Sequence, residues 1–392
     1  MRELSRVRLG VITASAMVIA TFPLIAFSVL AADLIDEFAI SRGQVGLLVT
    51  STSLVGALAS PLFGRITDRV GAVAATRSIF LIGLATLAAL AVSPVYVVLV
   101  VAALVAGVGN GWSNPATNSL IVGTVPSGSR GLVTGIKQSG VQLGTFLAGL
   151  LLPIFSALWN WRVAVSMFAA IPLAGLISTA GVVGLPADGE ILSSGHPVVP
   201  APVKWIAVYG AVSAMASSAM FGFLPLFAEE DQLWSASSAG MLVAIIGLTG
   251  MVARLGWPSV AERYLGHGRT LRVLALLSAG AALLLALAAL GVLPPWVLVP
   301  AALLLAGGTI AWMAVGMLAV MDLSVPSVVG RGTGVVLLGF YLGYSAGAPL
   351  MGLSVDVLGS YVPGWLTAMA LLVVASVLAG RVSEGGNLPS PS

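Results

Sequence analysis

The sequence contains no cysteine and very few charged residues, and both shortages limit what the protein can be. Without cysteine, the chain forms no disulfide bond and no thiolate metal site. Asp, Glu, Lys and Arg together make up 8% of the 392 residues, whereas soluble domains carry about 25%. So few charges cannot cover a water-exposed surface, and we expect most of this chain to face lipid.

Histidine is also scarce, and no arrangement of catalytic groups is present in the sequence. The two histidines, His196 and His267, fall in polar connecting segments. There is no Ser-His-Asp set, no metal-ligand cluster and no pair of carboxylates within one apolar run. We therefore expect no enzymatic activity, no metal and no other cofactor. The net charge of +3 is spread over loops, which argues against nucleic-acid binding.

Long apolar runs dominate the chain. A membrane-spanning helix needs about 20 apolar residues, and twelve runs approach or exceed that length. They cover residues 9–31, 44–65, 75–92, 95–122, 132–157, 162–185, 203–227, 237–258, 270–290, 294–321, 333–358 and 361–380. We number them spans one to twelve. The predicted fold class is an all-α integral membrane protein with twelve transmembrane helices.

Positive charge is distributed unevenly between the two sides of such a protein. Thirteen of the seventeen Lys and Arg residues lie on the side of the N-terminus, and only Arg42 and Arg162 lie on the other side. Cytoplasmic loops carry an excess of Lys and Arg. This pattern predicts that both termini are cytoplasmic, in a plasma membrane that we take to be a bacterial inner membrane.

A polar stretch divides the twelve runs into two sets of six. Residues 186–202 are rich in Pro, Gly and Ser and predict a cytoplasmic linker. The linker would join an N-terminal six-helix bundle, 1–185, to a C-terminal six-helix bundle, 203–382. The polar tail, 383–392, is expected to be disordered.

The two sets of runs resemble each other. Asp68-Arg69 follows span two and Glu262-Arg263 follows span eight. Gly140 in span five matches Gly343 in span eleven, a separation of 343 − 140 = 203 residues. These repeats predict two pseudo-symmetric bundles that arose by duplication. Parallel six-helix repeats with a substrate bound between them are a transporter architecture.

The loop after span two carries a recognisable motif. It reads Gly64-Arg65-Ile66-Thr67-Asp68-Arg69-Val70-Gly71, and it resembles the signature loop of the major facilitator superfamily. Ala72 stands where a basic residue is usual, and Pro258 replaces the first glycine in the second copy. The resemblance covers the whole chain and implies a rocker-switch transporter. It assigns the inward gate to Gly64, which allows close helix contact, and to the charges of Asp68, Arg69, Glu262 and Arg263.

Two cations stand inside apolar runs. Lys137 lies in span five and Arg254 in span eight. A charge in the hydrocarbon core costs about 2.5–3.5 kcal/mol on insertion scales, so such residues usually face a ligand or a wet cavity. Arg254 also resembles the eighth-span arginine that oxalate/formate and monocarboxylate transporters use on a substrate carboxylate. The alternative for each cation is a structural side chain that reaches toward the headgroups.

Polar and aromatic residues supply further candidates for substrate contacts. Asn110, Asn114 and Asn118 recur every four residues on one face of span four, and Tyr209, Ser213 and Ser217 do so in span seven. Interhelical hydrogen bonds are the alternative role for both stripes. The other candidates are Gln138 and Gln142 beside Lys137, and the aromatic residues Trp312, Tyr341 and Tyr344, for which plain packing is the alternative.

These features predict a monomeric secondary transporter of a small organic anion, a mono- or dicarboxylate, in the lipid bilayer. Coupling of transport to protons and exchange of the anion for another solute are both consistent with these features. One hypothesis is that Lys137 takes up a proton together with the anion. The alternative function is a proton-driven exporter of drugs or other amphipathic compounds, in which an acid such as Asp33 or Asp322 would be essential.

Overall fold

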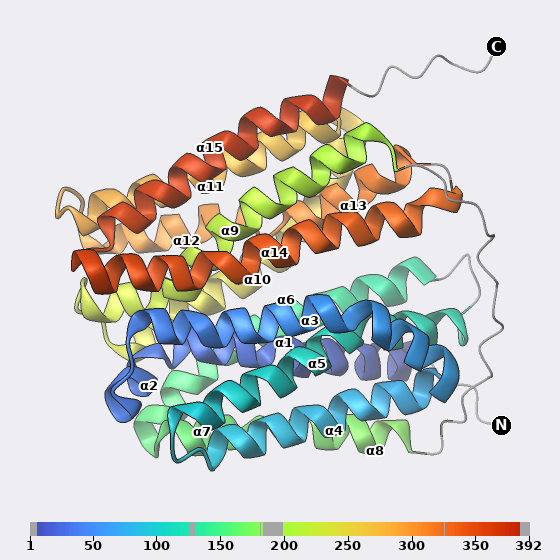
Figure 1. Ribbon diagram of the computed structural model, residues 1–392, viewed down its shortest axis with the longest axis horizontal. Helices are drawn as coiled ribbons and strands as arrows, with labels where there is room; N and C mark the ends of the chain where they lie inside the picture. Colours follow the sequence, from blue (N-terminus) through green and yellow to red (C-terminus); the bar gives the residue numbers. More distant parts are fainter. Residues whose placement is uncertain (1–5, 126–129, 181, 183–198, 325, 385–392) are drawn as a thin grey trace. The chain divides into compact units, whose positions relative to one another are not determined.

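The computed structural model describes residues 6–125, 130–180, 182, 199–324 and 326–384, and these residues form helices joined by short connections (Figure 1). Eleven helical segments are long and apolar enough to cross a membrane within the part described. The predicted second span, 44–65, falls in the 29-residue helix α3. The all-helical membrane class is confirmed, whereas the number of twelve spans and the position of the termini stay predictions.

Helix bounds follow the predicted spans closely. They are α1 (Arg6–Val29), α2 (Ala31–Phe38), α3 (Arg42–Val70), α4 (Ala72–Ala91), α5 (Tyr96–Val122), α6 (Arg130–Leu158), α7 (Trp161–Met167), α8 (Ala170–Thr179), α9 (Ala201–Glu230), α10 (Ala236–Val260), α11 (His267–Ala289), α12 (Leu298–Gly307), α13 (Trp312–Asp322), α14 (Pro326–Leu358) and α15 (Val362–Glu384). A π-helical turn (Ala261–Leu265) follows α10, and a 3-10 turn (Pro295–Val297) precedes α12.

The chain divides into two compact units. The first contains residues 1–190 together with 234–247, and the second contains 191–233 together with 248–392. The predicted linker 186–202 lies mostly outside the described residues, as does the predicted tail. The two-bundle division proposed from the sequence stays a prediction, because the first part of α10 is grouped with the first unit.

In the first unit, helices approach each other closely at glycines. α1 packs along α6, and α3 packs along α5. A side chain at Gly140 of α6 would collide with the backbone of Ala14 of α1, and one at Gly111 of α5 would collide with the backbone of Gly56 of α3. Glycine is therefore required where these backbones touch, because small residues allow helices to approach closely.

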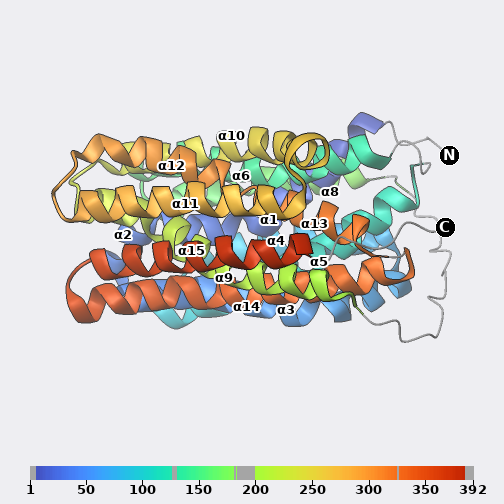
Figure 2. The same ribbon diagram turned by 90° about the horizontal axis from the view of Figure 1, so that it is seen from above.

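The second unit repeats one of these two contacts. α14 packs along α9, as α6 packs along α1, and α11 lies beside α15 (Figures 1 and 2). A side chain at Gly343 of α14 would collide with the backbone of Ala211 of α9. The same pairing of helices, through a glycine at the matching position, supports the predicted duplication.

Span ten departs from the expected single helix. It consists of α12 and α13, which are separated by a turn at residues 308–311. The predicted sixth span is likewise made of the two short helices α7 and α8. Both segments are apolar along their whole length, so hydropathy did not reveal the interruptions.

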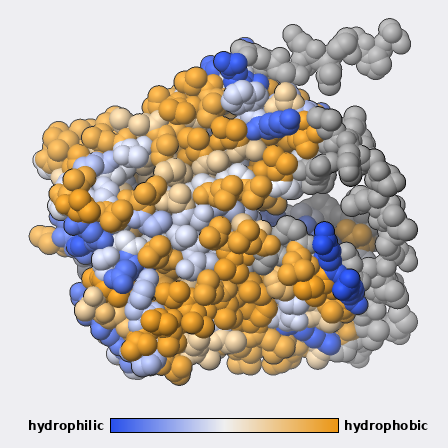
Figure 3. Space-filling view, in the orientation of Figure 1, coloured by the Kyte–Doolittle hydropathy of each residue, from blue (hydrophilic) through white to orange (hydrophobic). Residues whose placement is uncertain are grey.

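Apolar side chains cover most of the face shown in Figure 3. Among the described residues, many large apolar side chains are well exposed, for example Leu58 at 69%, Val252 at 66% and Val357 at 71%. A water-soluble protein rarely exposes contiguous apolar area on this scale. This surface is suited to lipid.

Candidate functional site

Lys137 lies at the centre of a polar contact between α5 and α6. Its side chain is fully buried, with 0% of its area exposed. The Nζ atom donates hydrogen bonds to Oδ1 of Asn114 at 2.9 Å and to Oδ1 of Asn118 at 2.7 Å. A buried ammonium needs such partners, because removing it from water is costly. Three residues that the sequence had marked separately therefore form one cluster.

Helix geometry explains which asparagines take part. Asn114 and Asn118 are four residues apart, so they lie one above the other on the face of α5 that meets α6. Asn110 is the third member of the stripe and is 6% exposed. It lies near Gly56 of α3, with its Oδ1 3.7 Å from the position that a Cβ of Gly56 would occupy. The stripe thus serves two neighbouring helices.

The two glutamines of span five differ in how much of their side chains is exposed. Gln138 is exposed, whereas Gln142 is 3% exposed. Successive residues of a helix are about 100° apart, so Gln138 does not share the face of Lys137. The proposed role of both glutamines in binding stays a prediction.

Arg254 in the second unit is held by backbone. Its Nε donates to the carbonyl oxygen of Ile310 at 3.1 Å, and the side chain is partly buried. Trp257, three residues further along α10, donates from Nε1 to the carbonyl oxygen of Gly307 at 2.8 Å. Both acceptors lie at the interruption between α12 and α13. The sequence did not predict a role for Trp257, because its partner is a backbone carbonyl, which every residue has.

The aromatic candidates of the second unit form a continuous cluster. Tyr209 and Trp312 are buried and meet edge to face, with ring centroids 5.6 Å apart. Phe340 links Trp312 to Tyr341 and Tyr344, at centroid distances of 6.2, 5.3 and 5.4 Å. Phe340, Tyr341 and Tyr344 are partly exposed, so these three are the members of the cluster that a ligand can reach.

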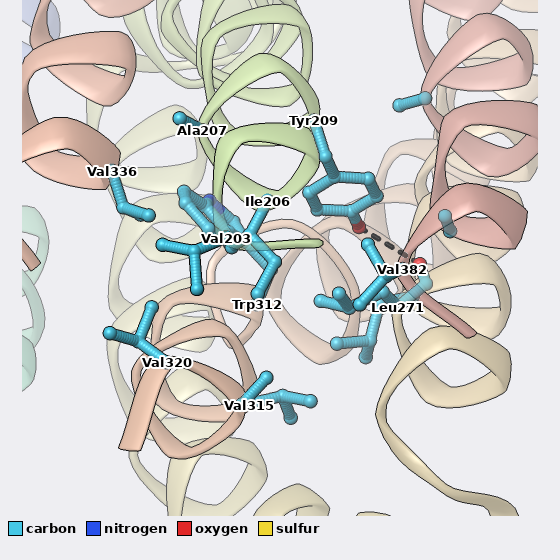
Figure 4. Packing of buried hydrophobic residues seen from close by; sticks show 14 of the residues in the cluster. Val203, Ile206, Ala207, Tyr209, Leu271, Trp312, Val315, Val320, Val336 and Val382 are labelled. Carbon is cyan, nitrogen blue, oxygen red and sulfur yellow. Dashed lines mark hydrogen bonds between the residues drawn. The ribbon is translucent and has the colours of Figure 1, made fainter. Parts of the chain in front are cut away.

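Tyr209 belongs to the hydrophobic core of its unit (Figure 4). Its hydroxyl donates to the carbonyl oxygen of Leu271 at 2.9 Å, and its ring is 0% exposed. Ser213, one turn further along α9, is also fully buried. The structure therefore places both residues inside the packing of this unit.

The predicted gate residues lie in the last two turns of α3 and in the π-helical turn that follows α10. Among the described residues, no atom lies within 4 Å of the position that a Cβ of Gly64 would occupy, so Gly64 makes no close helix contact there. The side chain of Asp68 lies outside the description. Arg69, Glu262 and Arg263 are exposed. The gate itself stays a prediction.

Two acidic residues with shifted pKa values, Asp33 and Glu37, lie on α2, beyond the end of the first predicted span. Asp33 accepts a hydrogen bond from Ser156 at 3.0 Å. Burial raises the pKa of Asp33, and the smaller effect of the Ser156 bond opposes that rise. Glu37 forms an ion pair with Arg162 and accepts a bond from Trp161. Burial raises the pKa of Glu37, but these bonds outweigh it and leave that pKa below its ordinary value.

Another acid, Asp322 at the end of α13, forms a hydrogen bond with His267. Its Oδ2 lies 2.9 Å from Nε2 of that histidine, at the start of α11. Among the described residues, no group of three His, Asp or Glu side chains could hold a metal ion. The polar chemistry of the chain is thus concentrated around Lys137, Arg254 and these acids.

Comparison with known proteins gives one family. The model of the Major Facilitator Superfamily matches residues 11–338. The hexuronate transporter of Bacillus subtilis (strain 168) is 27% identical over 152 residues, which cover 39% of this chain and 35% of that protein. An uncharacterised MFS-type transporter of Mycobacterium tuberculosis (strain ATCC 25618 / H37Rv) is 27% identical over 187 residues, or 46% of this chain and 42% of the relative. These alignments thus span less than half of either relative.

Solved structures share the fold over nearly the whole chain. The crystal structure of a D-xylose-proton symporter superposes with a TM-score of 0.79 and 14% identity, and it covers 98% of this chain and 100% of that one. A bacterial homolog of the human lysosomal transporter Spinster, inward-facing and occupied, superposes with a TM-score of 0.73 and 16% identity over 98% of both chains. At these identities the likeness concerns the fold alone.

Proposed function

Because this chain belongs to the major facilitator superfamily and is therefore a membrane transporter, we propose that it moves a small organic anion by alternating access. The observation that carries the proposal is the cluster of Lys137, Asn114 and Asn118. It places a cation and two amides on facing helices, where a charge is expensive unless it has a function.

The orientation of the amides favours an anion over a cation. Both Oδ1 atoms already accept bonds from Lys137. The remaining polar groups of Asn114 and Asn118 are therefore the amide N–H donors. Asn118 is exposed and Asn114 is partly exposed, so these donors are the groups that a solute meets first. A carboxylate accepts hydrogen bonds without donating any, which matches this surface.

The hexuronate transporter of B. subtilis suggests which carboxylates to test first. A hexuronate combines one carboxylate with several hydroxyl groups. In this proposal the donor surface around Lys137 recognises the carboxylate. Within the second unit, the partly exposed Tyr341 and Tyr344 are the aromatic faces available to a sugar ring. Arg254 contributes a second cation in the other unit, where its planar fork suits a carboxylate. Coupling to protons and exchange for another anion are both compatible with this set.

A second candidate is a proton-driven exporter of amphipathic compounds. The observation that favours it is Asp33, a partly buried acid whose pKa is raised by burial. An acid with a raised pKa keeps its proton to a higher pH than an ordinary carboxylate does, which suits proton coupling. In that case Asp33 would be essential for transport and Lys137 would not.

The experiment is a thermal-shift measurement on the purified full-length protein in detergent. The solutes are glucuronate and other organic anions, organic cations and neutral sugars, each tested on the natural protein and on Lys137→Gln and Arg254→Gln. A ligand that binds the folded state stabilises it, by about 2.7 kcal/mol at a hundred times its Kd.

We expect glucuronate or another carboxylate to raise the Tm of the natural protein and of neither variant. Neutral glucose is the matched control, because it lacks the carboxylate. If cations or neutral solutes raise all three Tm values equally, the anion site is wrong and the exporter function replaces it.

A further inference from the structure

The interruption of span ten leaves two backbone carbonyls without their helical partners. In a continuous helix, the carbonyls of Gly307 and Ile310 would accept from the amides four residues later. Here the amide of Ala311 donates instead to Gly308 at 3.0 Å, and the amide of Ala314 donates to Ala311 at 3.1 Å. The carbonyls of Gly307 and Ile310 are thereby released from the ladder.

Side chains from two neighbouring helices replace the lost bonds. Trp257 of α10 donates to the Gly307 carbonyl at 2.8 Å, and Arg254 of α10 donates to the Ile310 carbonyl at 3.1 Å. On the other side of the turn, Oγ of Ser278 of α11 accepts from the amide of Thr309 at 2.7 Å. Three displaced backbone groups thus have three dedicated side-chain partners.

This matching is required by the membrane. A backbone polar group without a partner costs several kcal/mol in hydrocarbon, so irregular backbone survives there only when it is satisfied by neighbouring groups. Arg254 and Trp257 are three residues apart, so one face of α10 presents both donors. Gly308 allows the approach of α11, because a Cβ at this position would lie 2.7 Å from the carbonyl oxygen of Leu274 and would collide with Ser278.

We propose that Trp257 and Ser278 are positioning residues for Arg254, and that Arg254 is shared between the Ile310 carbonyl and the transported anion. The inference rests on the proposed function for the identity of the anion. Trp257 and Ser278 keep span ten interrupted, so the Ile310 carbonyl is available to hold the Nε edge of the guanidinium. The plane of the fork is then set before a carboxylate arrives, which lowers the ordering cost of binding.

The same arrangement couples binding to the shape of span ten. A carboxylate that binds the guanidinium leaves the Nε bond to the Ile310 carbonyl in place. Without Arg254, that carbonyl can recover a partner by accepting from Ala314, as in a regular helix. Binding of an anion at Arg254 therefore favours the interrupted span ten, and a straighter span ten favours the empty site.

The absence of cysteine makes a direct test possible. Leu303 of α12 and Met321 of α13 lie on either side of the turn, and they are 44% and 53% exposed. Spin labels on the pair Leu303→Cys/Met321→Cys report the distance between the two helices by pulsed electron resonance, in the full-length protein in lipid. The pair is combined with Trp257→Phe, Ser278→Ala or Arg254→Gln. The matched controls are Trp205→Phe and Ser376→Ala, which remove the same groups elsewhere in the second unit.

We expect Trp257→Phe and Ser278→Ala to add a second distance population without any ligand, and both controls to keep the natural distance. Glucuronate affinity should fall about three- to tenfold in these two variants, which corresponds to one lost hydrogen bond. In the natural protein, saturating glucuronate should keep the natural distance, and in the two variants it should reduce the second population. Unchanged distances in Trp257→Phe and Ser278→Ala overturn the proposal, and so do changed distances with unchanged affinity.

Failure of the proposed function gives a different pattern. If no organic anion binds the natural protein, the ligand-free distances decide the inference. If Arg254→Gln gives the same distances as Trp257→Phe, the result supports the inference that Arg254, Trp257 and Ser278 together keep span ten interrupted. Arg254→Gln that keeps the natural distance overturns it.

Discussion

The two halves of the chain repeat one helix contact but fill it with different chemistry. Gly140 of α6 and Gly343 of α14 each touch the backbone of the first long helix of their unit, 203 residues apart. The same offset leads from Lys137 to Phe340, since 340 − 137 = 203. The position that holds a buried cation in the first unit therefore holds an aromatic ring in the second.

The partners differ in the same way. Lys137 is bonded to asparagines of α5, the fourth-span helix. Phe340 packs against Trp312 of α13 in the corresponding tenth span, with ring centroids 6.2 Å apart. Shared backbone packing with divergent side chains indicates that the glycine contacts serve the fold of both halves. In the proposed function, the polar cluster of Lys137, Asn114 and Asn118 in the first half serves recognition.

The largest loss of stability is expected from changes to the glycine contacts that the two halves share. Gly140→Val and Gly343→Val would each force helix backbones apart, and each should destabilise the protein by about 3 kcal/mol or more. Similar losses of Tm in the two variants would support the repeat. Gly135→Val and Gly334→Val are the controls, because no described atom lies within 4 Å of a Cβ at either position. A large loss in one half only would break the comparison.

The next largest effect is expected at Lys137 and its counterpart Phe340, where the two halves differ. Lys137→Met leaves the amide oxygens of Asn114 and Asn118 without their donor, which should cost about 2 kcal/mol of stability. Adding Asn114→Leu makes this contact apolar, like its counterpart in the second half, and should recover part of the loss. Phe340→Leu should keep anion binding, whereas Lys137→Met should abolish it. Chemical denaturation and thermal shift with glucuronate measure the two properties, and full additivity of the Lys137 and Asn114 changes would contradict the cluster.

Much of the first cluster could be predicted from the sequence. Lys137 is conspicuous as a cation in an apolar run, and the asparagines are conspicuous as a four-residue repeat. Their pairing was not predictable, because it depends on which faces of α5 and α6 meet. The close contacts at Gly111 and Gly140 follow from small residues at helical spacing.

The surroundings of Arg254 were beyond sequence reasoning. Its partner is the carbonyl of Ile310, and every residue has a carbonyl, so no residue type marks the contact. The interruption of span ten lies in a run that is apolar throughout, and only the pair Gly307-Gly308 hints at it. Hydropathy measures how well a segment suits lipid and not whether its hydrogen-bond ladder is continuous.

A smaller effect tests whether the second half recognises solutes through a hydroxyl. Tyr209→Phe removes the bond to the Leu271 carbonyl but keeps the ring against Trp312. Stability should fall by about 1 kcal/mol. Because the hydroxyl is buried in the core of its unit, glucuronate affinity should stay within about twofold of the natural value. A loss of affinity greater than the loss of stability would instead place Tyr209 at the binding site.

The smallest effects are expected in the acids of α2, where two carboxylates four residues apart have opposite pKa shifts. Asp33 has a raised pKa, so the folded state holds its proton more tightly than the unfolded state does. Its contribution to stability is full at low pH and is lost as the pH rises through the folded pKa. Glu37 has a lowered pKa, so its contribution is full above its unfolded pKa and is lost as the pH falls.

Removing each charge should therefore shift Tm in opposite directions at neutral pH. Asp33→Asn should raise Tm, because it removes a charge that burial disfavours and keeps a polar partner for Ser156. Glu37→Gln should lower Tm, because it removes the ion pair with Arg162. The loss of folding free energy should be about 1 kcal/mol or less, since the pair is partly exposed and screened by solvent. Both differences from the natural protein should shrink on acidification, as the carboxylates of the natural protein become protonated. A Tm series from neutral to acidic pH measures this, and equal signs for the two variants at neutral pH would show that one shift has been assigned in the wrong direction.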